Sequence, residues 1–209
     1  MNKKILYAAA MLIAYSRIAG ADTLPYVGME MGMNIESWRL KDTSAVSTDF
    51  SAKGVLGGVF AGFGGTINPC FYLGIEGFAN QDSTRSTTRL INVNGIPTGA
   101  LIRARYSYGG SIIPAYLFSR AGRIYGRIGA IRTRFELHQN NVPAGSTSNL
   151  NRNTVTGGEL GIGIQGSVAR NLALRAEYDY LAYRTFTSFQ NKIITRDNLF
   201  KVGMVYTFL

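Results

Sequence analysis

The stretch Val27-Gly-Met-Glu-Met-Gly-Met-Asn-Ile35 alternates strictly between two kinds of side chain. Its odd positions are all apolar, whereas its even positions are glycine, glutamate or asparagine. A period of two is typical of a β-strand whose two faces meet different surroundings. A transmembrane barrel strand, which crosses the bilayer with roughly nine to eleven residues, has lipid on one face and the lumen on the other. The stretch therefore predicts such a strand.

The same alternation recurs along the chain. The clear strands are Val27–Ile35, Phe71–Glu76, Glu159–Gln165, Leu172–Tyr180 and Phe200–Phe208. Three more are expected at about Gly54–Thr66, Arg105–Leu117 and Arg123–Thr133, where Gly, Tyr and Arg weaken the period. The predicted fold class is therefore all-β, an eight-stranded antiparallel up-and-down transmembrane β-barrel.

The connections between these strands alternate between short and long. Short turns are expected at Asn68-Pro69-Cys70, Ser119-Arg-Ala-Gly122 and Ala169-Arg-Asn171. In outer-membrane barrels the short turns are periplasmic and the long loops are extracellular. The expected extracellular loops are Trp38–Lys53, Gln81–Arg103, Glu136–Asn153 and Thr185–Asp197.

The first residues have the composition of an export signal. Lys3 and Lys4 precede the apolar stretch Ile5–Tyr15, and Ala19-Gly-Ala21 supplies the small residues of a cleavage site. The apolar stretch is shorter than the roughly 18 residues of a membrane helix. We therefore predict a signal peptide over residues 1–21, cleaved after Ala21, and one barrel domain over residues 22–209.

The composition excludes several classes of protein. The chain of 209 residues has a formal net charge of +10, which favours anionic partners, but no nucleic-acid-binding motif is visible. Cys70 is the only cysteine, which excludes an internal disulfide framework and any CxxC motif. Neither clustered metal ligands nor a phosphate-binding glycine loop occurs, so we expect no cofactor and no metal.

Four segments resemble a known family. They are Tyr72-Leu-Gly-Ile-Glu76-Gly, Ile124-Tyr-Gly-Arg127-Ile-Gly, Leu174-Arg-Ala-Glu177-Tyr and the terminal Arg196-Asp-Asn-Leu-Phe-Lys-Val-Gly-Met-Val-Tyr-Thr-Phe208. The chain is similar there to the small barrels of the outer-membrane protein A and opacity-protein group. This resemblance implies a location in the bacterial outer membrane, with outer-membrane lipid and lipopolysaccharide as neighbours, and a role as a surface antigen.

The last strand resembles the signal that the barrel-assembly machinery recognises. Its polar residue is Lys201, its glycine is Gly203, and its aromatic residues are Tyr206 and Phe208. The additional Leu209 departs from the usual aromatic end. The resemblance implies the assembly machinery as a partner.

The lumen of an eight-stranded barrel is just wide enough for side chains to fill it, which disfavours a general porin. Strand parity predicts a structural polar network of nearly balanced charge in it. Its predicted members are Glu30, Glu76, Glu159, Glu177, Asp179, Arg105, Arg127, Arg175 and Lys201.

The family resemblance also implies a switchable ion-pair cluster in this lumen. The positions that match it are Glu76, Glu177 and Arg196. Ile113 stands where the lysine of that cluster is expected, which counts against a gate.

A catalytic role has one candidate. Lipid-A-modifying barrels use a histidine with a serine and a carboxylate, and His138 lies near Glu136, with Ser146 and Ser148 downstream. The surrounding residues lack the motifs of such enzymes, so we expect no enzyme but a surface-interaction barrel that contacts host or cell-surface ligands through its loops. The alternatives are a narrow gated channel and a lipid-A-modifying enzyme.

Two further arginines carry a binding hypothesis. Arg132 and Arg134 are expected near the outer end of a strand, where they could contact lipopolysaccharide phosphates.

Overall fold

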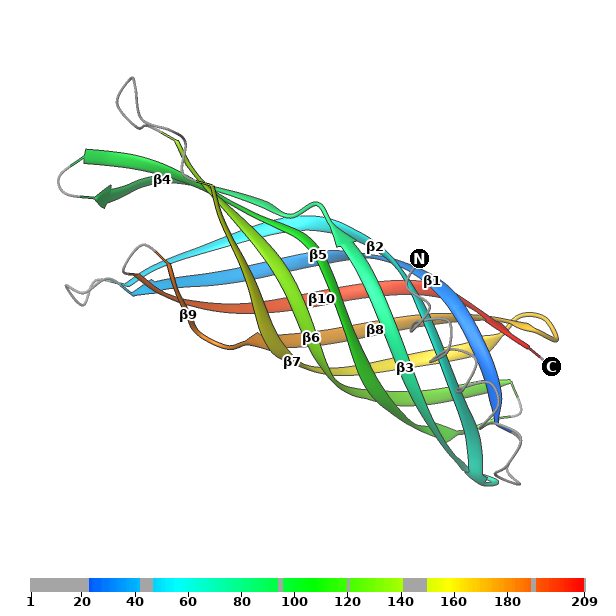
Figure 1. Ribbon diagram of the computed structural model, residues 1–209. Coiled ribbons are helices and arrows are strands. Elements are labelled where there is room, and N and C mark those ends of the chain that lie inside the picture. Colours follow the sequence, from blue (N-terminus) through cyan, green and yellow to red (C-terminus); the bar gives the residue numbers. More distant parts are fainter. Residues whose placement is uncertain are drawn as a thin grey trace, which may run out of the picture.

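The protein is a closed β-barrel, shown in Figure 1. The computed structural model describes residues 23–41, 47–93, 96–119, 121–140, 150–188 and 191–208, so the predicted signal peptide and its cleavage site lie outside the described residues. The sheet closes because β1 (Leu24–Lys41) pairs with both β2 (Ser47–Asn68) and β10 (Asn191–Thr207). The other strands are β3 (Phe71–Asp82), β4 (Arg85–Val93), β5 (Ile96–Leu117), β6 (Gly122–Asn140), β7 (Leu150–Ser167), β8 (Leu172–Tyr183) and β9 (Phe186–Ser188).

Eight of these strands form the barrel wall, in the order β1-β2-β3-β5-β6-β7-β8-β10, and neighbours are antiparallel. The prediction of an eight-stranded up-and-down barrel is confirmed. β4 pairs with β5, and β9 pairs with β10, outside this order. Within the described part of the chain, no helix has the length and apolar content needed to cross a membrane.

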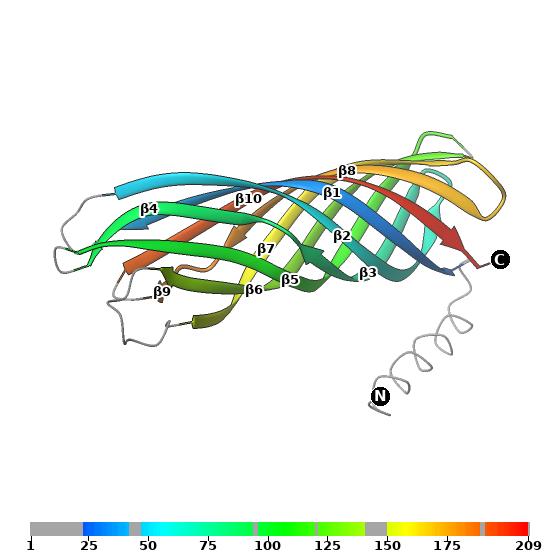
Figure 2. The same ribbon diagram turned by 90° about the horizontal axis from the view of Figure 1, so that it is seen from above.

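The two ends of the barrel differ. The turn end carries the three short connections around residues 69–70, 118–121 and 168–171, together with the first residue of β1 and the last of β10. Figure 2 shows the end of β10 at this side, away from β4 and β9. The opposite end, called the far end below, is the end at which β1, β4, β6 and β9 terminate.

The outer and inner faces separate as the alternation predicts. On β1, Met29 and Met31 are 64% exposed, whereas Glu30 between them is 5% exposed. Equivalent outward positions on the other strands make a continuous surface, called the apolar band below. Its members include Met33, Val59, Ile75, Ile112, Ile128, Leu160, Ile162, Phe200 and Val202.

The described residues of the four predicted loops are mostly strand. β1 continues to Lys41 and β2 begins at Ser47, so most of Trp38–Lys53 is a paired hairpin. The other three loops likewise contain β4 and the start of β5, the facing ends of β6 and β7, and β9 with the start of β10. These stretches lack hydrophobic alternation because they lie beyond the apolar band, while antiparallel pairing still satisfies their backbone groups.

The prediction for Arg105 is wrong. Along β5 and β6, Ala104 pairs with Phe135 and Tyr106 pairs with Arg134, so Arg105 is the extra residue of a β-bulge. A bulge reverses the relation between sequence parity and barrel face. Arg105 is therefore exposed rather than in the lumen.

The far end divides into two lobes, which diverge in Figure 1. The first lobe comprises the far ends of β1, β2 and β10 with β9, and the second comprises β4 and β5 with the far ends of β6 and β7. The pairing of β2 with β3 begins only at Leu56, and that of β7 with β8 only at Gly157. Above these positions, the described strands of one lobe do not pair with those of the other.

Candidate functional site

Eight of the nine predicted lumen residues come together inside the barrel, at inward positions of six strands. This set is called the lumen network below. Its members are Glu30, Glu76, Arg127, Glu159, Arg175, Glu177, Asp179 and Lys201, and all are buried.

Arg127 is one centre of the lumen network. Its guanidinium lies 2.5 Å from a Glu76 carboxylate oxygen and 3.0 Å from one of Glu177. Asp179 is at 4.0 Å, and the Phe78 ring centroid is 5.6 Å away. The side chain is 0% exposed, so this charge depends wholly on its protein partners.

Arg175 of β8 bridges two carboxylates on β1 and β3, across the β1–β10 closure of the barrel. Its Nη2 is 2.6 Å from Glu30 and its Nη1 is 2.8 Å from Glu76. The guanidinium also stacks over Phe60, 3.5 Å from the ring centroid. Arginine suits this position because its planar donors serve two carboxylates while its face packs on an aromatic ring.

Lys201 gathers the remaining carboxylates. Its ammonium lies 2.7 Å from Glu177 and 2.6 Å from Asp179, with Glu30 at 3.5 Å and Glu159 at 3.9 Å. Five carboxylates thus share three cations, which leaves the lumen network formally negative. The lumen network joins six strands of the wall by charge-assisted contacts and fills the lumen cross-section.

Three contacts of the network were missed by the sequence reasoning. Tyr26 donates a hydrogen bond to Glu76 at 3.2 Å, and Ser111 donates one to Glu159 at 2.9 Å. Phe60 supplies the stacking surface for Arg175. Inward parity could have identified these positions, but only the three-dimensional arrangement shows which charge they contact.

A second buried polar cluster lies between the lumen network and the far end. Asn34 donates hydrogen bonds from Nδ2 to Glu36 at 3.1 Å and to Asp82 at 2.9 Å. Glu36 stands directly opposite Asp197 in the β1–β10 register. Arg196, the neighbour of Asp197, is exposed, and Ile113 is buried in the lumen, so the cluster implied by the family resemblance is not assembled here.

Basic side chains gather outside the barrel, above the apolar band of β5, β6 and β7. Arg105 pairs with Glu136 at 2.9 Å, and Arg152 pairs with the same carboxylate at 3.4 Å. The two arginine side chains are about half exposed, and they cover Glu136. The bulge at Arg105 thus moves a charge from the lumen to this rim.

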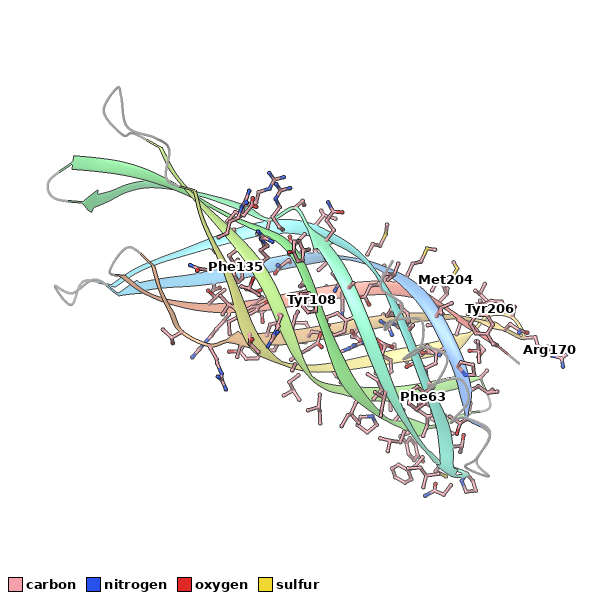
Figure 3. The ribbon with its side chains drawn as sticks, in the orientation of Figure 1. Phe63, Tyr108, Phe135, Arg170, Met204 and Tyr206 are labelled. Carbon is pink, nitrogen blue, oxygen red and sulfur yellow. The ribbon has the colours of Figure 1, made fainter. Side chains whose placement is uncertain are left out.

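The two arginines of the lipopolysaccharide hypothesis lie in the same region. Arg132 is exposed, and Arg134 donates a hydrogen bond to the Tyr106 hydroxyl at 2.9 Å. The Arg134 guanidinium also lies 5.7 Å from the Tyr106 ring centroid. Tyr106 and Tyr108 are exposed at the upper edge of the apolar band, and Figure 3 labels Tyr108 on β5.

The residues of the predicted assembly signal divide between the faces of β10. Lys201 is buried in the lumen network, whereas Tyr206 and Phe208 are exposed with ring centroids 5.2 Å apart. A Cβ at Gly203 would lie 2.9 Å from the Met29 carbonyl oxygen and 3.3 Å from Nε of Arg175. Glycine therefore makes room for Arg175 at this position.

The catalytic candidates are only partly described. His138 lies on β6, but its side chain is among those not described, and Ser146 and Ser148 lie outside the described residues. Among the described residues, no three His, Cys, Asp or Glu side chains could hold a metal ion together. Cys70 is exposed in a turn of the turn end.

The family comparison covers nearly the whole chain. Residues 5–208 match the family model described as the outer membrane protein beta-barrel domain. No curated protein matches the chain.

Solved structures resemble the fold at low sequence identity. The outer membrane protease OmpT from Escherichia coli is 8% identical, with a TM-score of 0.53 over 88% of this chain and 97% of that one. Neisserial surface protein A is 16% identical with a TM-score of 0.45, over 86% and 97% of the two chains. Ail of Yersinia pestis is 16% identical with a TM-score of 0.44, over 88% and 99%. By its family match and its closed eight-stranded wall, the chain belongs to the outer membrane protein beta-barrel domain family and is a protein of the bacterial outer membrane.

Proposed function

We propose that this protein is a non-enzymatic surface-interaction barrel, in which the membrane-spanning wall is a closed scaffold and the far end contacts ligands outside the cell. One observation carries the proposal: paired strands continue well beyond the apolar band. Among the β1 side chains that the structure describes, the last strongly exposed apolar one is Met33, but the strand runs to Lys41. At about 3.3 Å per residue, these eight or so positions extend roughly 26 Å.

The filled lumen supports a scaffold rather than a channel. An open pore would require the lumen network to separate, and each buried charge left without a partner costs several kcal/mol. The described carboxylates of the network all contact cations of the same network, so they are engaged in holding the wall together.

Shortening one lobe tests the proposed function. Residues 89–99, at the tip of the β4–β5 hairpin, would be replaced by Asn-Gly, which forms a tight turn after the Thr88↔Ala100 pair. Nanodiscs that contain the parent or the shortened barrel would be applied to arrays of extracellular-matrix proteins and glycosaminoglycans. We expect binding by the parent and its loss in the shortened variant.

The controls separate function from folding. Heat-dependent gel mobility would show that both barrels are folded, and planar bilayers would measure conductance. Equal array binding by the two proteins, or none by the parent together with a stable conductance, would contradict the proposal.

The basic rim also supports contact with lipopolysaccharide, which remains part of the proposal. Arg132 and Arg134 lie above the apolar band, where the phosphates of an outer-leaflet lipid would lie. We expect the double substitution Arg132→Gln with Arg134→Gln to lower the lipopolysaccharide retained per purified barrel severalfold, since each basic residue contributes about 1 kcal/mol near an anionic surface. Mass spectrometry of extracted lipid A would measure it.

Arg170→Gln is the matched control for this prediction. Arg170 is exposed at the tip of the turn end, as Figure 3 shows, so Arg170→Gln removes one positive charge from the opposite end of the barrel and is compared with the single substitutions Arg132→Gln and Arg134→Gln. If the double variant retained as much lipopolysaccharide as the parent, or if the control lost an equal amount, the proposed contact would be contradicted.

A further inference from the structure

A row of small residues crosses the outer face of the barrel wall. Its members stand directly opposite one another in the registers of adjacent strands, and all of them are exposed. Strands in membrane barrels are tilted by about 35–45°, so a row at right angles to them climbs obliquely round the barrel. From β2 to β7 the members of this small-residue row are Ala61, Gly77, Gly110, Ala130 and Gly158.

The lower part of the small-residue row is the floor of an apolar groove. The groove has a volume of about 720 Å³ and runs over Ala61 and Gly77, from Met204 of β10 to Gly109 of β5. Its lining is almost wholly apolar, and it opens outward, where the hydrocarbon of the bilayer lies. Figure 3 labels Met204 at one end of the groove and Tyr108 beside the other.

Larger side chains border the small-residue row on both sides. Ile75, Ile112 and Ile128 stand opposite one another on the side of the turn end, and each is more than half exposed. Val59 and Tyr108 border the row on the side of the far end, and both are exposed. The row is therefore a recess that continues from the groove towards β6.

The wall itself does not require the glycines of this recess. A Cβ at Gly77 would lie 3.9 and 4.0 Å from the nearest carbonyl oxygens, and a Cβ at Gly110 would lie 3.6 Å from another. These are ordinary van der Waals distances, and neither glycine has a left-handed φ. At Gly28, which faces the lumen, a Cβ would instead clash with Phe60. The space over Gly77 and Gly110 is thus free for a molecule outside the wall.

The upper end of the small-residue row meets a positive charge. Arg132 lies two residues after Ala130 on the same face of β6, and it stands opposite Tyr108. Its side chain is exposed, and no carboxylate of the described residues pairs with it. Glu136, the described carboxylate of this rim, pairs with two other arginines. Arg132 is therefore available to an anion of a molecule in the recess.

The dimensions of the recess match one leaflet of the bilayer. Ala130 of β6 and Val27 of β1 are separated by four strand spacings along the row, or about 19 Å. At a tilt of about 35–45° this path descends about 11–14 Å, which is close to half of the roughly 30 Å hydrocarbon core. A chain that enters beside Arg132 and follows the row therefore ends near the middle of the bilayer.

We propose that the groove binds one acyl chain of lipid A, the phosphorylated lipid of the outer leaflet, while a phosphate of the same molecule pairs with Arg132. This inference rests on the proposed contact between the basic rim and lipopolysaccharide, and it adds the place of the acyl chain. The small floor lets the chain lie close to the backbone, where it gains van der Waals contacts with the floor and both borders.

The charge beside the recess selects this lipid. A neutral lipid would fill the groove but leave Arg132 without an anion, whereas lipid A supplies the phosphate and the acyl chain in one molecule. A phospholipid of the opposite leaflet has its headgroup at the turn end, away from Arg132.

Filling the recess tests the inference. Gly77→Leu with Gly110→Leu places two side chains in the small-residue row, and the open Cβ positions allow the wall to accommodate them. The matched control is Gly57→Leu with Gly126→Leu. These two glycines also face outward and lie outside the groove, and their Cβ positions would be 4.0 and 3.7 Å from the nearest atoms. Heat-dependent gel mobility would show that all the barrels are folded.

The measurement is native mass spectrometry of full-length barrels titrated with purified lipid A, dephosphorylated lipid A or phosphatidylglycerol. We expect the parent and the control to bind lipid A alike, and the filled variant to bind it about threefold to tenfold more weakly. Arg132→Gln is expected to weaken the binding of lipid A but not of its dephosphorylated form. With a photoreactive group at the ends of the acyl chains, crosslinks near Val27 and Ala61 are expected in the parent and not in the filled variant.

Two results would overturn the inference: equal binding of lipid A by the filled variant and the control, or crosslinks spread evenly round the wall. If the parent bound phosphatidylglycerol or dephosphorylated lipid A as tightly as lipid A, the assignment to lipid A would be wrong. If filling the recess abolished self-association of the barrel and left lipid binding unchanged, the groove would belong to a second copy. In each case, loss of lipopolysaccharide from the Arg132→Gln, Arg134→Gln variant would still support the contact at the basic rim.

Discussion

Replacement of Arg127 by methionine is expected to lower the free energy of unfolding by about 3–5 kcal/mol, the usual cost of removing one partner from a buried ion pair. Arg127 is fully buried and contacts Glu76 and Glu177. Without it, five buried carboxylates would share only Arg175 and Lys201. Methionine keeps an unbranched apolar side chain in place of the aliphatic part of arginine, so the loss reports mainly the missing guanidinium charge and its contacts. Urea unfolding of the barrel in lipid vesicles, followed by tryptophan fluorescence and gel mobility, would measure it.

Arg105→Met is the matched control for this effect. Arg105 also pairs with a glutamate at 2.9 Å, but its side chain is 47% exposed. Exposed pairs contribute less than about 1 kcal/mol, so this variant should unfold almost like the parent. The double variant Arg127→Met with Glu177→Gln should recover part of the loss, because it removes one uncompensated carboxylate. If Arg127→Met and Arg105→Met destabilised the barrel equally, the lumen network would not be a special source of its stability.

The substitution Leu160→Arg is also expected to have a large effect, lowering the free energy of unfolding by about 2–4 kcal/mol. Leu160 is 60% exposed and lies in the apolar band of β7. A guanidinium there would face hydrocarbon, where no water solvates it. The loss would be measured by the same unfolding assay in vesicles, and it should become smaller in short-chain lipid, which brings the interface closer.

Thr154→Arg provides the comparison on the same strand. Thr154 is also exposed, but it lies six residues nearer the far end, beyond the apolar band. Near the interface the cost of arginine falls to about 0–1 kcal/mol. If Thr154→Arg destabilised the barrel as much as Leu160→Arg, the bilayer would not lie where the apolar band places it.

Much of the membrane-spanning wall could be predicted from local sequence. Met29, Glu30 and Met31 occupy the faces that their alternation indicates, because successive side chains of a strand point to opposite sides. The eight members of the lumen network were predicted from the same alternation of inward and outward positions. The far-end hairpins were not, since a strand with water on both faces has no hydrophobic period to detect.

What the sequence by itself determined is the class of fold, the number of wall strands, the short turns and the face on which most charges lie, all of which follow from short-range alternation and turn residues. Only the tertiary structure decided the rest. Arg105 lies outside the lumen because a bulge in β5 reverses the face on which it would otherwise lie. The bulge depends on the pairing of β5 with β6. Glu76 and Arg175 meet although they are 99 residues apart, because closure of the barrel and the register of each strand pair place them together. The two lobes of the far end separate for the same reason: β2 and β4 each pair with only one neighbour there, and pairing between strands is not encoded within either strand alone.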